Sequence, residues 1–119
     1  MARQTIEQRR AQRALEWAER PSTDNEKRKS AAESFAPLIL MSGLGQAAAF
    51  YKSKGEHHVD LYELLSDWLR ETGQPLSQGS GDLLHRLVTA DQGVYRAAQA
   101  EALAFLQWVK KFAKAYGGA

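Results

Sequence analysis

Apolar residues recur at helical spacing along most of the chain, and the segment 59–72 shows the pattern best. Side chains three and four positions apart lie on the same side of an α-helix, and acidic residues occupy other positions of this segment. The pattern predicts an amphipathic helix that ends at Gly73 and Pro75. Its apolar face consists of Leu61, Leu64, Leu65, Trp68 and Leu69.

Two capping boxes mark the beginnings of earlier helices. In such a box, a Ser or Thr side chain and a Gln or Glu side chain three positions later each bond the other residue's backbone N–H. Thr5 and Gln8 fit this spacing, and so do Thr23 and Glu26. Pro21 is expected to end the first helix, since the residue before a proline is pushed out of the helical region.

Proline and glycine divide the part of the chain that follows. Pro37 lies within the apolar stretch 31–41 and is expected to kink or break the helix, because proline lacks a backbone donor. Gly43 is expected to end that helix before the next begins. A further helical segment covers 46–54, and Gly55 is a suitable stop.

The last third of the chain predicts a loop and two more helices. Residues 73–81 are rich in Gly, Ser and Gln, and this composition predicts a mobile surface loop. A short helix follows over 82–89. Asp91 is a suitable N-cap for the final helix, which is predicted to run to about Tyr116 and to end at Gly117.

Composition supports this helical interpretation. The 119 residues include 19 Ala and 14 Leu but only ten Val, Ile and Thr together, and β-branched residues are typical of strands. The predicted fold is all-α, with one domain over residues 1–119 built as a single compact bundle of five to six helices. The chain has no Cys, which excludes a disulfide framework, a thiol nucleophile and a Cys-based zinc site.

The sequence offers no segment suited to a membrane. The longest apolar run without a charged residue, 35–51, is interrupted by Pro37, Ser42 and two glycines. It is too short and too broken for a membrane span of about 20 residues. The charged start of the sequence lacks the apolar core of a secretory signal. We therefore expect a cytoplasmic protein without a membrane partner.

Charge is unevenly distributed along the chain, although the net charge is only +2. Residues 1–29 contain eight Arg or Lys against five Asp or Glu, residues 60–92 contain two against six, and residues 93–119 contain four against one. Basic ends around an acidic part suit one surface for a polyanion and a separate surface of opposite sign. Solvated helix faces that differ in charge are the alternative, and the counts alone do not choose between them.

Three basic clusters are the candidate sites for nucleic acid. Lys and Arg contacts to phosphates hold a nucleic acid without reading its sequence, and the planar guanidinium of Arg suits such contacts. Trp17 follows the first cluster and is expected to be available for stacking, while His57 and His58 extend the second. The clusters comprise Arg9, Arg10 and Arg13; Lys52 and Lys54; and Lys110, Lys111 and Lys114.

Patterns that would support an enzyme are weak. Residues 43–48 match G-x-G-x-x-A, a dinucleotide-binding pattern, but no strand is predicted before them, and small residues there favour close approach of two helices. His57 and His58 are adjacent, so on a helix they point about 100° apart and chelate one ion poorly. No serine lies in a G-x-S-x-G context. We expect no cofactor, no metal and no catalytic residue.

The sequence resembles a known family over most of its length. The most specific block is 43–54, with the order G-L-x-Q-x-x-A-F-x-x-S-K, whereas 20–30 and 73–81 have no counterpart. The family is the small helical subunit of the type III-B CRISPR–Cas effector, called the RAMP-module or Cmr complex. The resembling parts are 8–11 with 14–16, 37–39 with 42–46, 49–54, and 95–98 with 101–106, 108 and 111–113.

The resemblance implies an all-helical protein without a catalytic centre. Copies would stack as an inner filament beside the large polymerase-type subunit and the backbone subunits, line the path of guide RNA and target RNA, and support antiviral defence. RNA cleavage and cyclic-oligonucleotide synthesis would belong to other subunits. Arg13 and Lys110 are candidates from the charge pattern alone. The RNA-facing candidates that the resemblance implies are Arg9, Arg10, Lys52, Lys54 and Lys111.

Two other functions stay open at this point. A free-standing helical adaptor would bind protein only and have no affinity for RNA. A small metal-dependent nuclease would use the region of His57 and His58. The charge distribution also suggests a hypothesis about assembly, namely that copies stack head to tail through surfaces of opposite charge.

Overall fold

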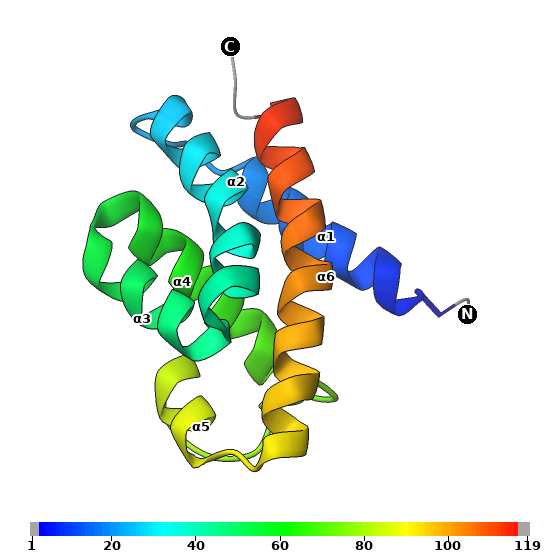
Figure 1. Cartoon of the computed structure of the whole chain (residues 1–119). Helices are drawn as coiled ribbons and strands as arrows, with labels where there is room; N and C mark the ends of the chain where they lie inside the picture. Colours follow the sequence, from blue (N-terminus) through cyan, green and yellow to red (C-terminus); the bar gives the residue numbers. More distant parts are fainter. Residues whose placement is uncertain (1–2, 117–119) are drawn as a thin grey trace.

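The computed structural model describes residues 3–116, and every regular element in that range is an α-helix. The predicted all-α fold is therefore confirmed. Figure 1 shows the long last helix running beside the second in the opposite direction and crossing the first, with the short fifth helix at the opposite end from the C-terminus. The helices are α1 (Ile6–Ala18), α2 (Asn25–Ser42), α3 (Leu44–Lys54), α4 (Glu56–Arg70), α5 (Leu83–Thr89) and α6 (Gln92–Tyr116).

One of the two predicted capping boxes is confirmed. Gln8 N donates to Thr5 Oγ1 at 3.1 Å, and Thr5 N donates to Gln8 Oε1 at 2.8 Å. The box predicted at Thr23 is wrong, because α2 begins one residue later. Asp24 is the N-cap, and its carboxylate accepts from Lys27 N at 3.1 Å. A carboxylate both caps the first turn and complements the helix dipole.

Of the two outcomes expected at Pro37, a kink or a break, the break is wrong, since α2 continues through Pro37 to Ser42. Proline removes one backbone donor and leaves the carbonyl of Glu33 without its helical partner. Both Glu33 and Pro37 lie on the exposed side of α2, so water can satisfy that carbonyl. The helix ends as predicted at Gly43, whose φ of +86° suits glycine. The end predicted at Gly117 lies outside the described residues.

The core forms where the apolar faces of the helices meet. All five residues predicted for the apolar face of α4 are buried. α6 packs mainly against α1 and α2, while α3 packs between α2 and α4. Two aromatic stacks cross these contacts: Trp68 lies 5.1 Å from Phe105 between ring centroids, and Phe35 lies 3.8 Å from Tyr51. These large side chains fix α4 to α6 and α2 to α3.

The glycine pair that resembles a dinucleotide motif is a helix-packing element. No strand precedes it, and α3 begins directly after Gly43. Two side chains of α6 cap this helix: Tyr95 Oη accepts from Gly45 N at 2.8 Å, and Gln99 Oε1 accepts from Leu44 N at 2.9 Å. A Cβ on Gly45 would lie 3.2 Å from Tyr95 Oη. Close approach of two helices, as predicted, is what the small residue permits.

The predicted loop at 73–81 contains no helix, but it is not entirely on the surface. Leu76 and Gln74 are buried. The Arg86 guanidinium donates to the carbonyl oxygens of Leu76 and Gly81 at 2.7 Å each. The middle of the loop is therefore anchored to α5, and its mobility stays a prediction. Among the described helices, none is both long enough and apolar enough to cross a membrane.

Candidate nucleic-acid interface

Two of the three α1 arginines are occupied by ion pairs within the fold. Arg10 donates from Nε and Nη2 to the carboxylate of Glu101 on α6, at 2.7 Å each, and it also pairs with Glu7. The hydrogen bonds that Arg10 donates to Glu101, together with those to Glu7, raise the pKa of Arg10 above its ordinary value, although burial opposes them. Arg13 pairs with Glu71 after the end of α4. These contacts join α1 to two other parts of the bundle.

Arg9 is the exposed member of this cluster. Its guanidinium lies 5.9 Å from the centroid of the Trp68 ring, and it has no ion pair with any residue of 3–116.

The expectation that Trp17 is available for stacking is wrong. Trp17 is fully buried, donates from Nε1 to Asp60 Oδ2 at 2.9 Å, and lies beneath the guanidinium of Arg28, 4.1 Å from the ring centroid.

A sequence signal for the burial of Trp17 was present. Ala14, Trp17 and Ala18 are spaced at i, i+3 and i+4, and these three are the buried residues of α1. Ala14 and Ala18 belong to the apolar stripe that Ala11, Ala14, Leu15 and Ala18 form in the sequence, whereas Ala11 and Leu15 are only half-buried. An aromatic residue at that spacing belongs to the core.

The two lysines of α3 have different surroundings. Lys52 Nζ lies 2.7 Å from Asp82 Oδ2, the same oxygen that accepts from Tyr62 Oη at 2.7 Å. The hydrogen bonds from Lys52 and Tyr62 hold the pKa of Asp82 well below its ordinary value. Lys54 is exposed, and no carboxylate in the described part of the chain lies within ion-pair distance of it. Its Nζ lies 5.7 Å from the centroid of the Phe50 ring.

The α6 lysines occupy the last turns of the longest helix. Lys111 and Lys114 are exposed and Lys110 is half-buried. None of the three is ion-paired with another residue between 3 and 116. Cations at this end of a helix also complement its dipole. These lysines are therefore free to contact an external anion.

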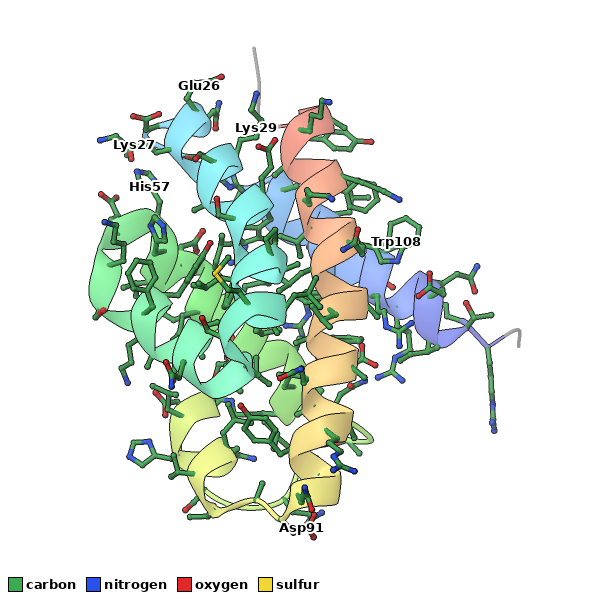
Figure 2. All side chains as sticks on the ribbon, in the orientation of Figure 1. Glu26, Lys27, Lys29, His57, Asp91 and Trp108 are labelled. Atoms are coloured by element: carbon green, nitrogen blue, oxygen red, sulfur yellow. The ribbon has the colours of Figure 1, made fainter. Side chains whose placement is uncertain are left out.

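The beginning of α2 lies at the same end of the bundle as the end of α6, because the two helices pack together and run in opposite directions (Figure 1). Lys27 and Lys29 extend from that end, whereas Asp91 lies at the far end (Figure 2). Lys29 is 3.7 Å from Glu26, and Lys27 has no such partner among the described residues. Sequence reasoning missed Lys27 as a candidate, since no pattern links it to α6 or to α4.

The histidines do not form a metal centre in the described part of the chain. No group of three or more His, Asp or Glu residues there is arranged to hold an ion. His57 and His58 are half-buried in the first turn of α4, beside Lys27 and Lys54. Burial, with the nearby charge of Lys54 and His57, lowers the pKa of His58. His85 is far along the chain and contacts Asp82, with Nδ1 and Oδ1 2.7 Å apart.

Comparison with known proteins identifies the fold and the family. The family model for the CRISPR-associated protein Cas_Cmr5 matches residues 6–116. An X-ray crystal structure of a CRISPR-associated Cmr5 family protein from Thermus thermophilus is similar over 97% of this chain and 100% of that chain, with 27% sequence identity and a TM-score of 0.80. The chain therefore belongs to the Cmr5 family, the small subunit of the type III-B CRISPR Cmr complex.

Proposed function

We propose that this protein is a non-catalytic subunit of a cytoplasmic type III-B ribonucleoprotein that acts in antiviral defence. Copies of it form an inner filament that lines the path of guide RNA and target RNA. Membership of the Cmr5 family supports the assignment to the complex. The observation that carries RNA contact is the exposure of Lys54, Lys111 and Lys114, none of which has a carboxylate partner within residues 3–116.

Contacts of this kind recognise the backbone of RNA. Lysine presents a point charge on a flexible stem, so it neutralises phosphates without discriminating between bases. A subunit that lines a guide–target duplex needs such tolerance, because the guide sequence varies. Binding should therefore weaken steeply with salt, because the release of condensed counterions from the RNA drives binding less strongly when salt is abundant.

Protein partners would be the large polymerase-type subunit, the backbone subunits and further copies of the chain. Leu40 and Met41 at the end of α2 support such contacts, since they are 72% and 82% exposed. Pro37 lies one turn earlier on the same exposed side. Adjacent apolar side chains exposed together are typical of protein interfaces.

The charge distribution supports head-to-tail stacking of copies. Lys27 and Lys29 extend from one end of the bundle and Asp91 from the other (Figure 2). Opposite charges on opposite ends attract successive copies in one orientation. Sedimentation of the isolated chain at rising salt tests this stacking. Self-association that weakens with salt supports it, and an assembly insensitive to salt contradicts it.

Co-purification of the tagged full-length chain tests the proposed function. The expected result is recovery of larger effector subunits together with a guide RNA that can be sequenced. The double variant Leu40→Ser with Met41→Ser should recover less of the partner subunits, while the isolated chain should fold like the wild type. Recovery of the chain without RNA and without effector subunits would overturn the proposal. Recovery of protein partners without RNA, even at low salt, would favour a protein-binding adaptor.

A further inference from the structure

A cavity of about 410 Å³ lies where α2, α3 and α4 meet. Its walls come from the first turns of α2, the last turn of α3 and the first turn of α4. Figure 2 shows Lys27 and His57 extending toward the same region from α2 and α4. The lining residues are Lys27, Ser30, Lys54, Gly55, Glu56, His57 and His58.

The side chains of this cavity are predominantly basic. Lys27 and Lys54 come from different helices and have no ion pair with any described residue. His57 and His58 have no hydrogen-bonded partner for their rings within residues 3–116. Glu56 is the single acid in the lining. Four nitrogen-bearing side chains therefore converge here against one carboxylate. Such a cavity suits an anion as its ligand.

Two further features add to the attraction for an anion. No side chain caps the first turn of α4, so its N–H groups at Glu56 and His57 are available. A second cavity, of about 270 Å³, shares Glu56 and His57 and adds Arg20 and Arg28. Nε of the buried Arg28 has no hydrogen-bond partner among the described residues. Basic side chains therefore continue beyond the first cavity toward the end of α1.

We propose that the cavity between α2, α3 and α4 binds a backbone phosphate of RNA, and that His58 strengthens this binding as the pH falls. The choice of RNA as the source of the phosphate rests on the proposed function. Lys27 of α2 and Lys54 of α3 supply permanent charge. His58 supplies a charge that depends on pH, because histidine is the side chain whose charge ordinarily changes in the physiological range.

The surroundings of His58 determine the direction of the pH effect. Its ring centroid lies 4.6 Å from that of Tyr51 and 6.4 Å from that of Phe50, so apolar rings cover one side. Burial, Lys54 and His57 lower the pKa of His58, which keeps its ring neutral in the free chain at neutral pH. A bound phosphate offsets the repulsion from these cations. Binding is then accompanied by proton uptake, and affinity rises as the pH falls.

The groups that face His57 come from several elements. Lys27 of α2 and Lys54 of α3 line the first cavity with it, and Arg20 and Arg28 line the second. Glu56 on α4 and Asp60, one turn later, are the acids on this side. Asp60 is already bonded to the indole of Trp17. The lysines and arginines of the two cavities outnumber these acids, so the permanent charges alone attract a phosphate.

Titration of a fluorescent oligouridylate into the full chain, at about pH 8 and at about pH 6, tests the pH effect. The wild-type affinity should rise several-fold on acidification. His57→Gln with His58→Gln should abolish most of that rise, and Lys54→Gln should weaken binding at both values. His85→Gln is the matched control, because this exposed histidine contacts Asp82 and does not line the cavity. An equal rise in the wild type and the double variant would overturn the role of His58.

Nuclear magnetic resonance with inorganic phosphate tests the site itself. Phosphate should shift the ring signals of His57 and His58 but not that of His85, and the absence of a shift would overturn the phosphate site. Shifts with phosphate but no binding of oligouridylate would support the site and overturn RNA as its ligand. Failure of the wild type to bind any RNA would contradict the proposed function. RNA binding without changes in the signals of these rings would agree with the proposed function but contradict the cavity as the phosphate site.

Discussion

Arg10 of α1 and Glu101 of α6 form a two-point ion pair, with both N–O distances at 2.7 Å. The same carboxylate accepts from Trp68 Nε1 of α4 at 2.9 Å. One acid, the single one after residue 92, thus connects three helices. This contact gives Arg10 a role in the fold that its position in a basic cluster did not suggest.

Removal of Glu101 should cost more stability than removal of Arg10. Glu101→Ala removes the carboxylate that the Arg10 guanidinium and the Trp68 indole share and leaves Arg10 with Glu7 alone, so we expect a loss of about 2–4 kcal/mol in the free energy of unfolding. Arg10→Ala should cost about 1–3 kcal/mol, and urea denaturation of both variants and of the double variant measures their coupling. Asp67→Ala, which breaks the exposed pair with Arg70, is the control and should change stability by about 0.5 kcal/mol or less. Additive effects of the two substitutions would contradict the pairing.

Local sequence was sufficient for most of the helix boundaries. The capping box of Thr5 and Gln8 and the glycine after α2 depend on atoms within four residues of each other, so spacing alone predicts them. The start of α2 differed because Asp24 competes with Thr23 for the same role. The outcome at Pro37 could not be predicted locally. The energetic cost of a proline within the helix depends on whether water reaches the carbonyl of Glu33, and this depends on how α2 packs.

Long-range pairing explains why the candidate site could be predicted only in part. A cluster of arginines in the sequence is compatible with either solvent or an acid from elsewhere. The partners of Arg10 and Arg13 lie 91 and 58 residues away, beyond any spacing rule. Lys27 joins Lys54 and the histidines for the same reason, because tertiary packing alone brings the start of α2 beside the α3–α4 junction.

Gly45→Ala should destabilise the protein by about 1 kcal/mol, although alanine favours a helix, because the added Cβ pushes against the Tyr95 hydroxyl. Tyr95→Phe should itself cost about 1 kcal/mol by leaving Gly45 N–H unpaired. In that background the cost of Gly45→Ala should fall toward zero or change sign. Gly93→Ala is the control, since its nearest contact is an ordinary 3.5 Å to Asp91 Oδ1. Thermal unfolding of the four variants measures these effects. If Gly45→Ala costs the same stability with Tyr95 as with Phe at position 95, the contact between the added Cβ and the Tyr95 hydroxyl is contradicted.

The carboxylate of Asp82 should make stability depend on acid pH. Lys52, Tyr62 and His85 contact it, and together they hold its pKa below the ordinary value of 3.8. A lowered pKa in the folded state contributes stability above pH 3.8, and this contribution is lost progressively as the pH falls below that value.

Asp82→Asn tests this dependence. The variant should be less stable than the wild type by about 1–2 kcal/mol at neutral pH, and the difference should shrink as the solution is acidified. Denaturant unfolding over a series of pH values measures both curves. Asp67→Asn, whose carboxylate lies in an exposed pair, provides the comparison and should follow the wild type. A difference between Asp82→Asn and wild type that stays constant down to the acid end would show that the ionised form is not what the fold stabilises.

The two lysines of α3 allow a paired test of RNA contact. Lys54 has no acid within ion-pair distance among the described residues, whereas Lys52 is held by Asp82 at 2.7 Å. If Lys54 neutralises a phosphate, Lys54→Gln should reduce the slope of log affinity against log salt by about 0.7, the value for one contact to a single strand. Lys52→Gln should reduce the slope less, because its charge is already neutralised within the fold. The slopes come from oligouridylate titrations at several salt concentrations. Equal reductions would mean that RNA displaces Asp82 from Lys52, and the ion pairs of the free chain would then not decide which cations meet RNA.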